Sequence, residues 1–382
     1  MYGLFIKTNR LFLVGSFLGA IFLSSFFQGD ESIIYTQAAT VSLEPGGIPG
    51  DTLAFQDSAS SDTLFLVLTG ENIPLHYYKR IHTGVCFDNK CRELDIILYW
   101  NITGRYLGFE LPVGEFLSKS EHRPFSSEEY ESLNDLLADP TLPFGDISFN
   151  SLMDASKSAT GLVDGVSGAT SAAVEKIVVR GAAYTTYTLW NMVYGPTQAL
   201  VCQLTEEQLK PDLIDLILHS PDINDRVWAL EKIDQSIELN PELTSSLLNM
   251  IKGEDFFFAY SAVKTIGPVH LNSDTFQSAL FLSYGEVNFS IQSLIIEKFM
   301  EAPFLSPDVL ETSRGYLEQL NGQQLGEFLR VYTKHSVFDL ETCQTIARIL
   351  QNENRYIAQK AYEYLKGVET SDPKILEIQN AL

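Results

Sequence analysis

A six-residue pattern recurs at a regular interval in the carboxyl-terminal half of the chain. Trp228–Ile233 is echoed at 261–266 and at 294–299, and fainter echoes follow at 328–333 and 360–365. Polar turn residues separate the copies, and Leu, Gln and Glu are frequent between them. A period of about 33 residues, built from paired amphipathic helices, is typical of an α-solenoid. Each helix pair then buries its apolar face only by stacking on its neighbours.

These repeats resemble degenerate HEAT repeats, which implies an all-α, HEAT-like solenoid over residues 200–382. Two interpretations of the solenoid remain open. It presents an extended surface to a protein partner, or it only stabilises the neighbouring domain. Cys202 and Cys343 lie in this half and are expected to be buried thiols.

The chain is strongly acidic, which restricts its partners. Its 382 residues include 26 Lys and Arg against 49 Asp and Glu, a formal net charge of −23, and no run of basic residues occurs. Phosphate backbones would repel such a chain, so no nucleic acid partner is expected. The four cysteines form no CxxC pattern, and no HExxH, Walker or Ser-His-Asp signature is present, so neither a metal site nor catalytic residues are assigned.

The amino terminus carries an export signal. Lys7 and Arg10 precede the apolar run from Leu11 to Phe27, and Asp30 and Glu31 follow it. Residues 1–29 are therefore expected to be a signal peptide or an uncleaved membrane anchor, with the basic flank in the cytoplasm. This places the protein at the cell membrane, facing the periplasm or the outside.

Residues 30–62 contain no Lys or Arg and are rich in Ser, Thr, Gly and Pro. Such a composition buries little surface, so we expect a flexible linker between the membrane and a folded body.

The middle of the chain has the pattern of a β-sheet. Thr63–Leu68 is a short apolar run, the segments Tyr77–Val85 and Tyr106–Leu111 are strand-like, and apolar residues alternate from Leu94 to Trp100. Turn residues separate these segments. The sequence predicts a three-stranded antiparallel meander inside an α+β domain that extends over residues 63–195.

Cys86 and Cys91 flank a turn in this region and would face each other across it. In an oxidising compartment a hairpin disulfide is the simplest interpretation. The alternative is a zinc site that adds His82 and His76, because thiolate and imidazole are the ligands that zinc prefers.

Two helices are predicted beside the sheet. Ser126 and Glu129 form a capping-box pattern, followed by a helix over 127–138 that ends near Asp139. A long apolar helix is predicted from about Ala172 to Val193. Its aromatic residues Tyr184, Tyr187 and Trp190 suit either a core or a stacking surface for a planar ligand.

Just before this second helix lies the segment Asp164-Gly165-Val166-Ser167-Gly168-Ala169-Thr170-Ser171. Ser and Thr at a helix start often serve only as caps. Free backbone N–H groups and small residues at a helix start also favour phosphate binding, and the Thr170 hydroxyl would lie at that point.

This segment resembles the motif of the FMN-binding domain family found in accessory subunits of Rnf and of sodium-translocating NADH:quinone oxidoreductase. The family motif is Asp, two variable positions, then Ser/Thr-Gly-Ala-Thr, and Asp164, Ser167, Gly168, Ala169 and Thr170 match it, with Ser171 following. The resemblance implies that Thr170 receives FMN through a phosphodiester bond made by a separate magnesium-dependent flavin transferase. It also implies that Asp164 and the residues from Ser167 to Ala169 are recognised by the transferase and surround the phosphate.

Taken with the export signal, the resemblance implies an extracytoplasmic, membrane-associated flavoprotein that transfers electrons rather than converting a substrate. Its partners would be the flavin transferase, a redox protein or membrane complex, the membrane itself, and a protein bound by the repeats. The alternative is a non-enzymatic scaffold that acts through its helical repeats and has a flavin-free middle domain.

Overall fold

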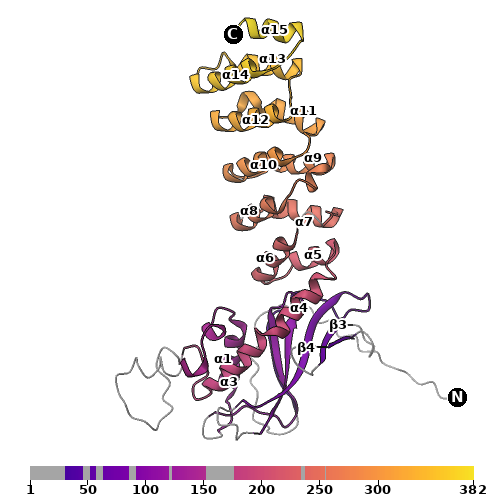
Figure 1. Ribbon diagram of the computed structural model, residues 1–382, viewed down its shortest axis with the longest axis vertical. Helices are drawn as coiled ribbons and strands as arrows, with labels where there is room; N and C mark the ends of the chain where they lie inside the picture. Colours follow the sequence, from indigo (N-terminus) through magenta and orange to yellow (C-terminus); the bar gives the residue numbers. More distant parts are fainter. Residues whose placement is uncertain are drawn as a thin grey trace, which may run out of the picture.

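The computed structural model describes residues 31–45, 52–56, 63–85, 92–119, 123–151, 176–233, 237–253 and 255–382. A sheet with helices on one face lies at one end of the molecule (Figure 1). From it a column of paired helices leads to the carboxyl terminus at the far end. The expected combination of an α+β domain and a following helical region is confirmed at this level.

The sheet has six antiparallel strands in the order β1-β6-β5-β4-β3-β2. The strands are β1 (Ile33–Thr36), β2 (Thr52–Gln56), β3 (Thr63–Leu68), β4 (Pro74–Thr83), β5 (Leu94–Asn101) and β6 (Tyr106–Leu111). The strands β2 to β6 follow one another as a meander. The predicted antiparallel meander is therefore confirmed, but it has more strands than the three predicted.

The expectation of a flexible linker over 30–62 is wrong where the structure describes this segment. Ile33–Thr36 and Thr52–Gln56 form the two edge strands of the sheet. Between them, Thr40 and Val41 are buried, and the Thr40 amide donates to the Asn101 side chain at 2.9 Å. The Ser- and Thr-rich composition without Lys or Arg, which suggests a linker, also suits edge strands, because backbone hydrogen bonds hold such strands in place.

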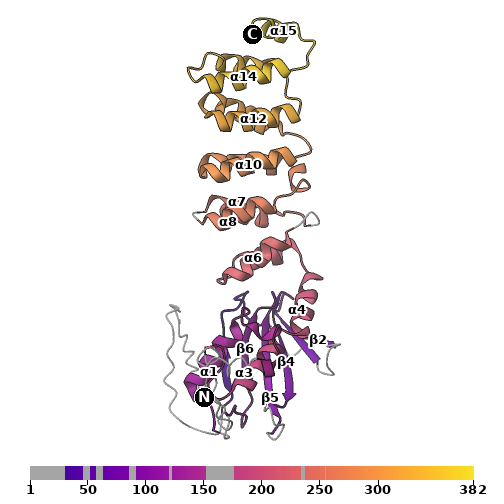
Figure 2. The ribbon, with the colours of Figure 1, turned by 60° about the vertical axis from the view of Figure 1, so that its left-hand side comes forward.

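One face of the sheet is covered by helices α1 (Ser127–Ala138), α3 (Ala183–Val193) and α4 (Pro196–Glu206). The three helices and the sheet are seen together in Figure 2. Buried side chains alternate with half-exposed ones along β3 and β5, so the core lies between this face and the helices. Trp100 is fully buried there, and its indole N–H donates to the Val193 carbonyl at 2.9 Å.

The predicted helix over 127–138 is confirmed, together with its capping box at Ser126 and Glu129. The predicted helix from Ala172 is too long, because α3 begins only at Ala183 and residues 176–182 form turns. Two features stop the helix from extending backwards. Gly181 has a φ of 79°, and the amide of Val179 is bound by the Thr186 hydroxyl instead of a helical carbonyl.

The column consists of two-helix repeats. The first helices of the pairs are α5 (Pro211–Leu218), α7 (Pro241–Lys252), α9 (Asp274–Ser283), α11 (Pro307–Tyr316), α13 (Leu340–Ile349) and α15 (Pro373–Asn380). The second helices are α6 (Ile223–Lys232), α8 (Phe256–Thr265), α10 (Phe289–Glu301), α12 (Gly322–Lys334) and α14 (Arg355–Gly367). The starts of the second helices are evenly spaced along the chain.

Short 3₁₀ helices lie at Pro143–Gly145, in the sheet domain, and at His270–Asn272, Tyr284–Glu286 and Leu317–Gln319, in the column.

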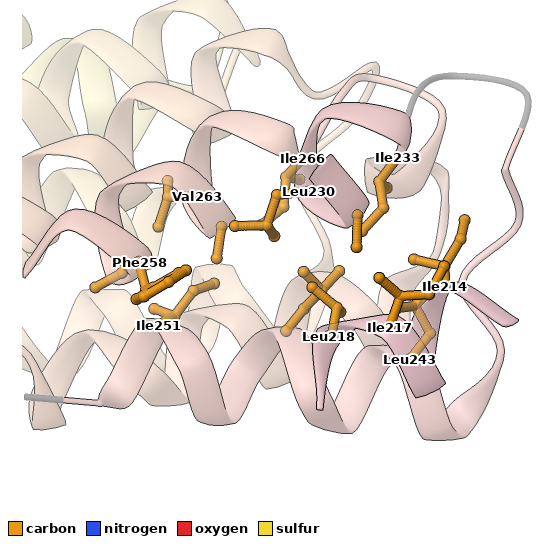
Figure 3. Packing of buried hydrophobic residues seen from close by; sticks show 14 of the residues in the cluster. Ile214, Ile217, Leu218, Leu230, Ile233, Leu243, Ile251, Phe258, Val263 and Ile266 are labelled. Carbon is orange, nitrogen blue, oxygen red and sulfur yellow. The ribbon is translucent and has the colours of Figure 1, made fainter. Parts of the chain in front are cut away.

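Each second helix starts at the same capped position. An Asp or Asn side chain accepts a hydrogen bond from the first turn at Asp222, Asp255, Asn288, Asn321 and Asn354. This cap ends the preceding turn at a fixed repeat position. Between the two helix layers, apolar side chains form a continuous core, shown for the first repeats in Figure 3.

Polar bonds also join one repeat to the next. The Thr265 hydroxyl donates to the Leu230 carbonyl at 3.2 Å, and the Lys334 ammonium donates to the Ala302 carbonyl at 3.0 Å. These acceptors lie at or just beyond the carboxyl ends of α6 and α10. Helix-end carbonyls are therefore satisfied by the following repeat, which ties neighbours together beyond apolar contact.

The sheet domain and the column share a polar junction. Asp225, in the first turn of α6, is 1% exposed and accepts hydrogen bonds from Arg105, Thr103 and Ser220. The Arg105 guanidinium also donates to the Ala38 carbonyl at 2.7 Å. The turn between β5 and β6 is thus bound both to the segment after β1 and to the first repeat.

Candidate functional site

The residues of the flavin-type motif, Asp164, Ser167, Gly168, Ala169, Thr170 and Ser171, lie outside the residues that the structure describes. Cys86 and Cys91 also lie outside them. The attachment of FMN and the hairpin disulfide therefore stay predictions from the sequence. Ser151 and Lys176 are the described residues that border the motif segment.

Of the aromatic residues of α3, Trp190 lies in the core of the sheet domain and Tyr187 packs against it, whereas Tyr184 is half-buried. Trp190 meets Phe144 edge-on with ring centroids 5.6 Å apart, and Tyr187 meets the same ring at 5.7 Å. Tyr184 meets Phe149 edge-on at 5.0 Å.

The polar atoms of this aromatic cluster are also used. The Tyr187 hydroxyl donates to the Ile147 carbonyl at 3.1 Å, and the Trp190 N–H donates to the Asp139 carbonyl at 2.8 Å. These side chains fasten the 139–149 segment to α3. Their engagement fits a structural role.

A second aromatic group lies on the face of the sheet opposite α1, α3 and α4. The Phe65 ring stacks on Tyr78 with centroids 5.0 Å apart, Tyr78 lies 6.0 Å from Tyr99, and Tyr99 lies 6.0 Å from His76. We call these four residues, drawn from β3, β4 and β5, the aromatic strip. All four side chains are half-buried. A planar group can contact such a strip with little loss of side-chain entropy, because rings have few rotatable bonds.

The surroundings of His76 and Tyr99 favour the neutral form of each side chain. Burial lowers the pKa of His76. Burial and the hydrogen bond from the Tyr99 hydroxyl to Glu110, at 2.8 Å, raise the pKa of Tyr99 well above its usual value. On the same sheet face, Arg80 forms an ion pair with Asp95.

The aromatic strip is not among the predicted site residues, although the sequence carries a signal for it. In β3 and β5 the residues between the buried ones are Phe65, Val67, Asp95, Ile97 and Tyr99, and all except Asp95 are apolar or aromatic, where an open sheet face usually carries polar side chains.

The alternative zinc site gains no support from the described histidines. His76 packs against Tyr99, and His82 lies 3.4 Å from the Asp95 carboxylate. Within the described ranges, no group of three or more His, Cys, Asp and Glu side chains could hold a metal ion.

Of the two remaining cysteines, Cys343 is buried as predicted, whereas Cys202 is only partly buried. Both are free thiols. Cys202 lies on α4, where its Sγ is 3.6 Å from the Thr103 carbonyl. It therefore belongs to the contact between α4 and the sheet.

Among the helices that the structure describes, none is long and apolar enough to cross a membrane. The apolar run from Leu11 to Phe27 lies outside the described residues.

No family model, curated protein or solved structure matches the chain.

Proposed function

We propose that this protein is an extracytoplasmic electron carrier that holds FMN covalently on Thr170. The observation that carries the proposal is the segment from Asp164 to Ser171, in which every fixed position of the flavin-attachment motif is present. An antiparallel sheet with helices on one face is also the class of domain that the resemblance implies.

Attachment would form an ester bond between the Thr170 hydroxyl oxygen and the flavin phosphate, and the hydroxyl would lose its proton. The donor must be an activated flavin phosphate, such as a flavin–nucleotide pyrophosphate, whose pyrophosphate bond breaks and whose nucleotide leaves. A separate flavin transferase would catalyse this step. Bound FMN supplies one- and two-electron redox chemistry, while the chain supplies its position and surroundings.

The proposed location rests on Lys7 and Arg10, the apolar run behind them and the acidic residues that follow. This order favours a basic end inside the cytoplasm and an acidic body outside. A covalent bond would keep the flavin on the protein in a compartment where a dissociated cofactor is lost. The electron partner would be a redox protein or a membrane complex.

The proposal is tested by co-expressing the full chain with a flavin transferase and illuminating a denaturing gel with ultraviolet light. A fluorescent band is expected for the native chain and for Ser171→Ala, and no band for Thr170→Ala. Ser171→Ala is the matched control, because it removes the adjacent hydroxyl. The absence of fluorescence from the native chain, or its persistence in Thr170→Ala, would contradict covalent attachment at Thr170.

The competing function is a non-enzymatic scaffold with a flavin-free middle domain. The observation that favours it is the array of two-helix repeats, since such arrays commonly bind other proteins. A colourless protein that still captures its partner would support the scaffold over the flavoprotein.

A further inference from the structure

A group of exposed apolar side chains lies on the second helices of the first three repeats. Phe256, Phe257 and Tyr260 on α8 are 51%, 53% and 41% exposed. Ile223 and Phe289 occupy the same first-turn position of α6 and α10 as Phe256 does in α8, and they are 54% and 42% exposed. We call these five residues the apolar patch. Monomeric proteins rarely expose several large apolar residues side by side without a binding role.

The patch borders a groove between α6 and α8, which are neighbours in the column (Figure 1). The groove has a volume of about 480 Å³. Val227 and Leu230 of α6 face Phe257 and Tyr260 of α8 across it. Leu230 is buried and forms part of the floor, so the groove offers an apolar base beneath exposed rings.

The fold itself does not require aromatic residues at these positions. Two repeats later, in α12, Gln323 and Gly326 stand at the positions of Phe257 and Tyr260, and in α14 these positions hold Tyr356 and Gln359. In α10, Ser293 stands at the position of Tyr260. The same helix pair thus folds with polar or small residues at both places, and the rings of α8 serve something other than repeat packing.

Charge indicates what kind of partner fits. The groove lining carries one acid and one base, Glu231 and Lys264, and residues 211–266 around it contain ten Asp and Glu against four Lys and Arg. A second copy of this chain is disfavoured, because two molecules with a net charge of −23 repel each other. A positively charged partner is attracted instead, and the apolar groove would take its apolar side.

We propose that the groove between α6 and α8 binds an amphipathic helix of another protein, with its apolar side in the groove and basic residues at its margins. Each of the two groove helices has ten residues, which gives a groove about 15 Å long. About three turns of a partner helix span this length and place apolar residues at positions i, i+3, i+4 and i+7. This inference is independent of whether Thr170 carries FMN.

The test uses the full chain and two synthetic helical peptides that share one apolar face of Leu and Phe. One peptide has a Lys-rich polar face and the other a Glu-rich polar face. Titration is followed by the fluorescence anisotropy of a labelled peptide. We expect saturable binding of the Lys-rich peptide and at least tenfold weaker binding of the Glu-rich peptide.

Two variants locate the binding. Phe257→Gln combined with Tyr260→Ser introduces residue types that the chain itself carries at these repeat positions, so folding should be preserved, as checked by circular dichroism. This double variant should bind the Lys-rich peptide at least tenfold more weakly. The control Tyr356→Gln changes an exposed ring at the α12–α14 groove and should bind it as the native chain does.

Three outcomes would overturn the proposal: no saturable binding of the Lys-rich peptide, equal binding of both peptides, or unchanged affinity in the folded double variant. Sedimentation equilibrium adds a fourth. A dimer of the native chain that dissociates in the double variant would show that a second copy occupies the groove.

Discussion

Arg105, in the turn between β5 and β6, holds Asp225 of α6 in a two-pronged ion pair. Its Nη2 lies 2.8 Å and its Nε 3.0 Å from the two carboxylate oxygens. Asp225 also accepts from Thr103 and Ser220, so the buried charge is fully bonded. This largely buried ion pair fixes the first repeat to the sheet.

Replacing Asp225 with Ala should weaken the junction by about 3 kcal/mol, because it leaves the guanidinium of Arg105 without its main partner in a largely buried place. Hydrogen exchange should accelerate in α5 and α6, while the distant α12 to α15 stay protected. Asp222→Asn is the control. It removes a longer ion pair to Arg105, at 3.4 Å, but keeps a side chain that can cap α6. Equal exchange in the two variants would contradict a special role of Asp225.

The same residue predicts how stability depends on pH. Burial alone would raise the pKa of Asp225, but the hydrogen bonds from Arg105 and Thr103 outweigh burial and lower it. A carboxylate with a lowered pKa in the folded state stabilises the fold above its unfolded pKa of about 4 and loses this effect as the pH falls further. The difference in melting temperature between the native chain and Asp225→Asn should be constant from pH 5 to 7 and shrink below pH 4. A difference that grows in acid would refute this.

Gln277 joins two repeats and should be a weak point when replaced. Its amide donates to the carbonyls of Leu271 and Phe304, at 2.7 and 3.0 Å, and its oxygen accepts from the Ser306 amide at 2.9 Å. Gln277→Leu leaves these buried backbone groups without a partner and should cost about 2 to 4 kcal/mol locally. Faster hydrogen exchange over 303–316 in Gln277→Leu would show this local loss of stability. Gln323→Leu, at an exposed position, should have little effect.

Gly108 lets β1 lie against β6. A Cβ at this position would lie 2.2 Å from the Tyr35 carbonyl oxygen, so Gly108→Ala forces the edge strand away. We expect a loss of roughly 1 to 3 kcal/mol and early hydrogen exchange over Ile33–Thr36. In the control Gly70→Ala, nothing lies within 4 Å of the new carbon. Unchanged exchange in β1 would mean that the strand does not pack as described.

Thiol chemistry gives a further prediction. Burial raises the pKa of Cys343 to about 11, and burial also raises that of Cys202. At pH 8 the thiolate fraction of Cys343 is then on the order of a hundredfold below that of a free cysteine. Iodoacetamide should modify Cys343 only after denaturation, as followed by intact mass. If Cys86 and Cys91 form the predicted disulfide, the unreduced, denatured protein takes up two equivalents. Four equivalents would exclude the disulfide.

The sequence predicted most of the repeat region and of the central strands, because periodicity reports directly on which faces are buried. The regular spacing of Trp228, Ser261 and Leu294 coincides with the spacing of the second helices. The strands at 63–68 and 106–111 have the predicted bounds. In these places local pattern and tertiary packing agree.

Other parts depend on contacts that composition does not show. Edge strand β1 has only four residues, and its backbone bonds to β6 and the packing of Ile33 and Tyr35 on the core hold it in place. The start of α3 is set by Gly181 and by the bond from Val179 to Thr186, which a periodicity argument cannot detect. The motif around Thr170 was found by resemblance, and its chemistry awaits the gel experiment.

Because the repeat length is constant, the column can be shortened by removing one whole repeat. Because a capped start recurs at the same position of every repeat, excising residues 289–321 would join Asn288 directly to Gly322 and give each remaining helix a neighbour of the same kind. The free end would move closer to the sheet by one helix layer, about 10 Å. The distance between the sheet and the free end of the column can therefore change by one repeat at a time, independently of the surface chemistry of the repeats.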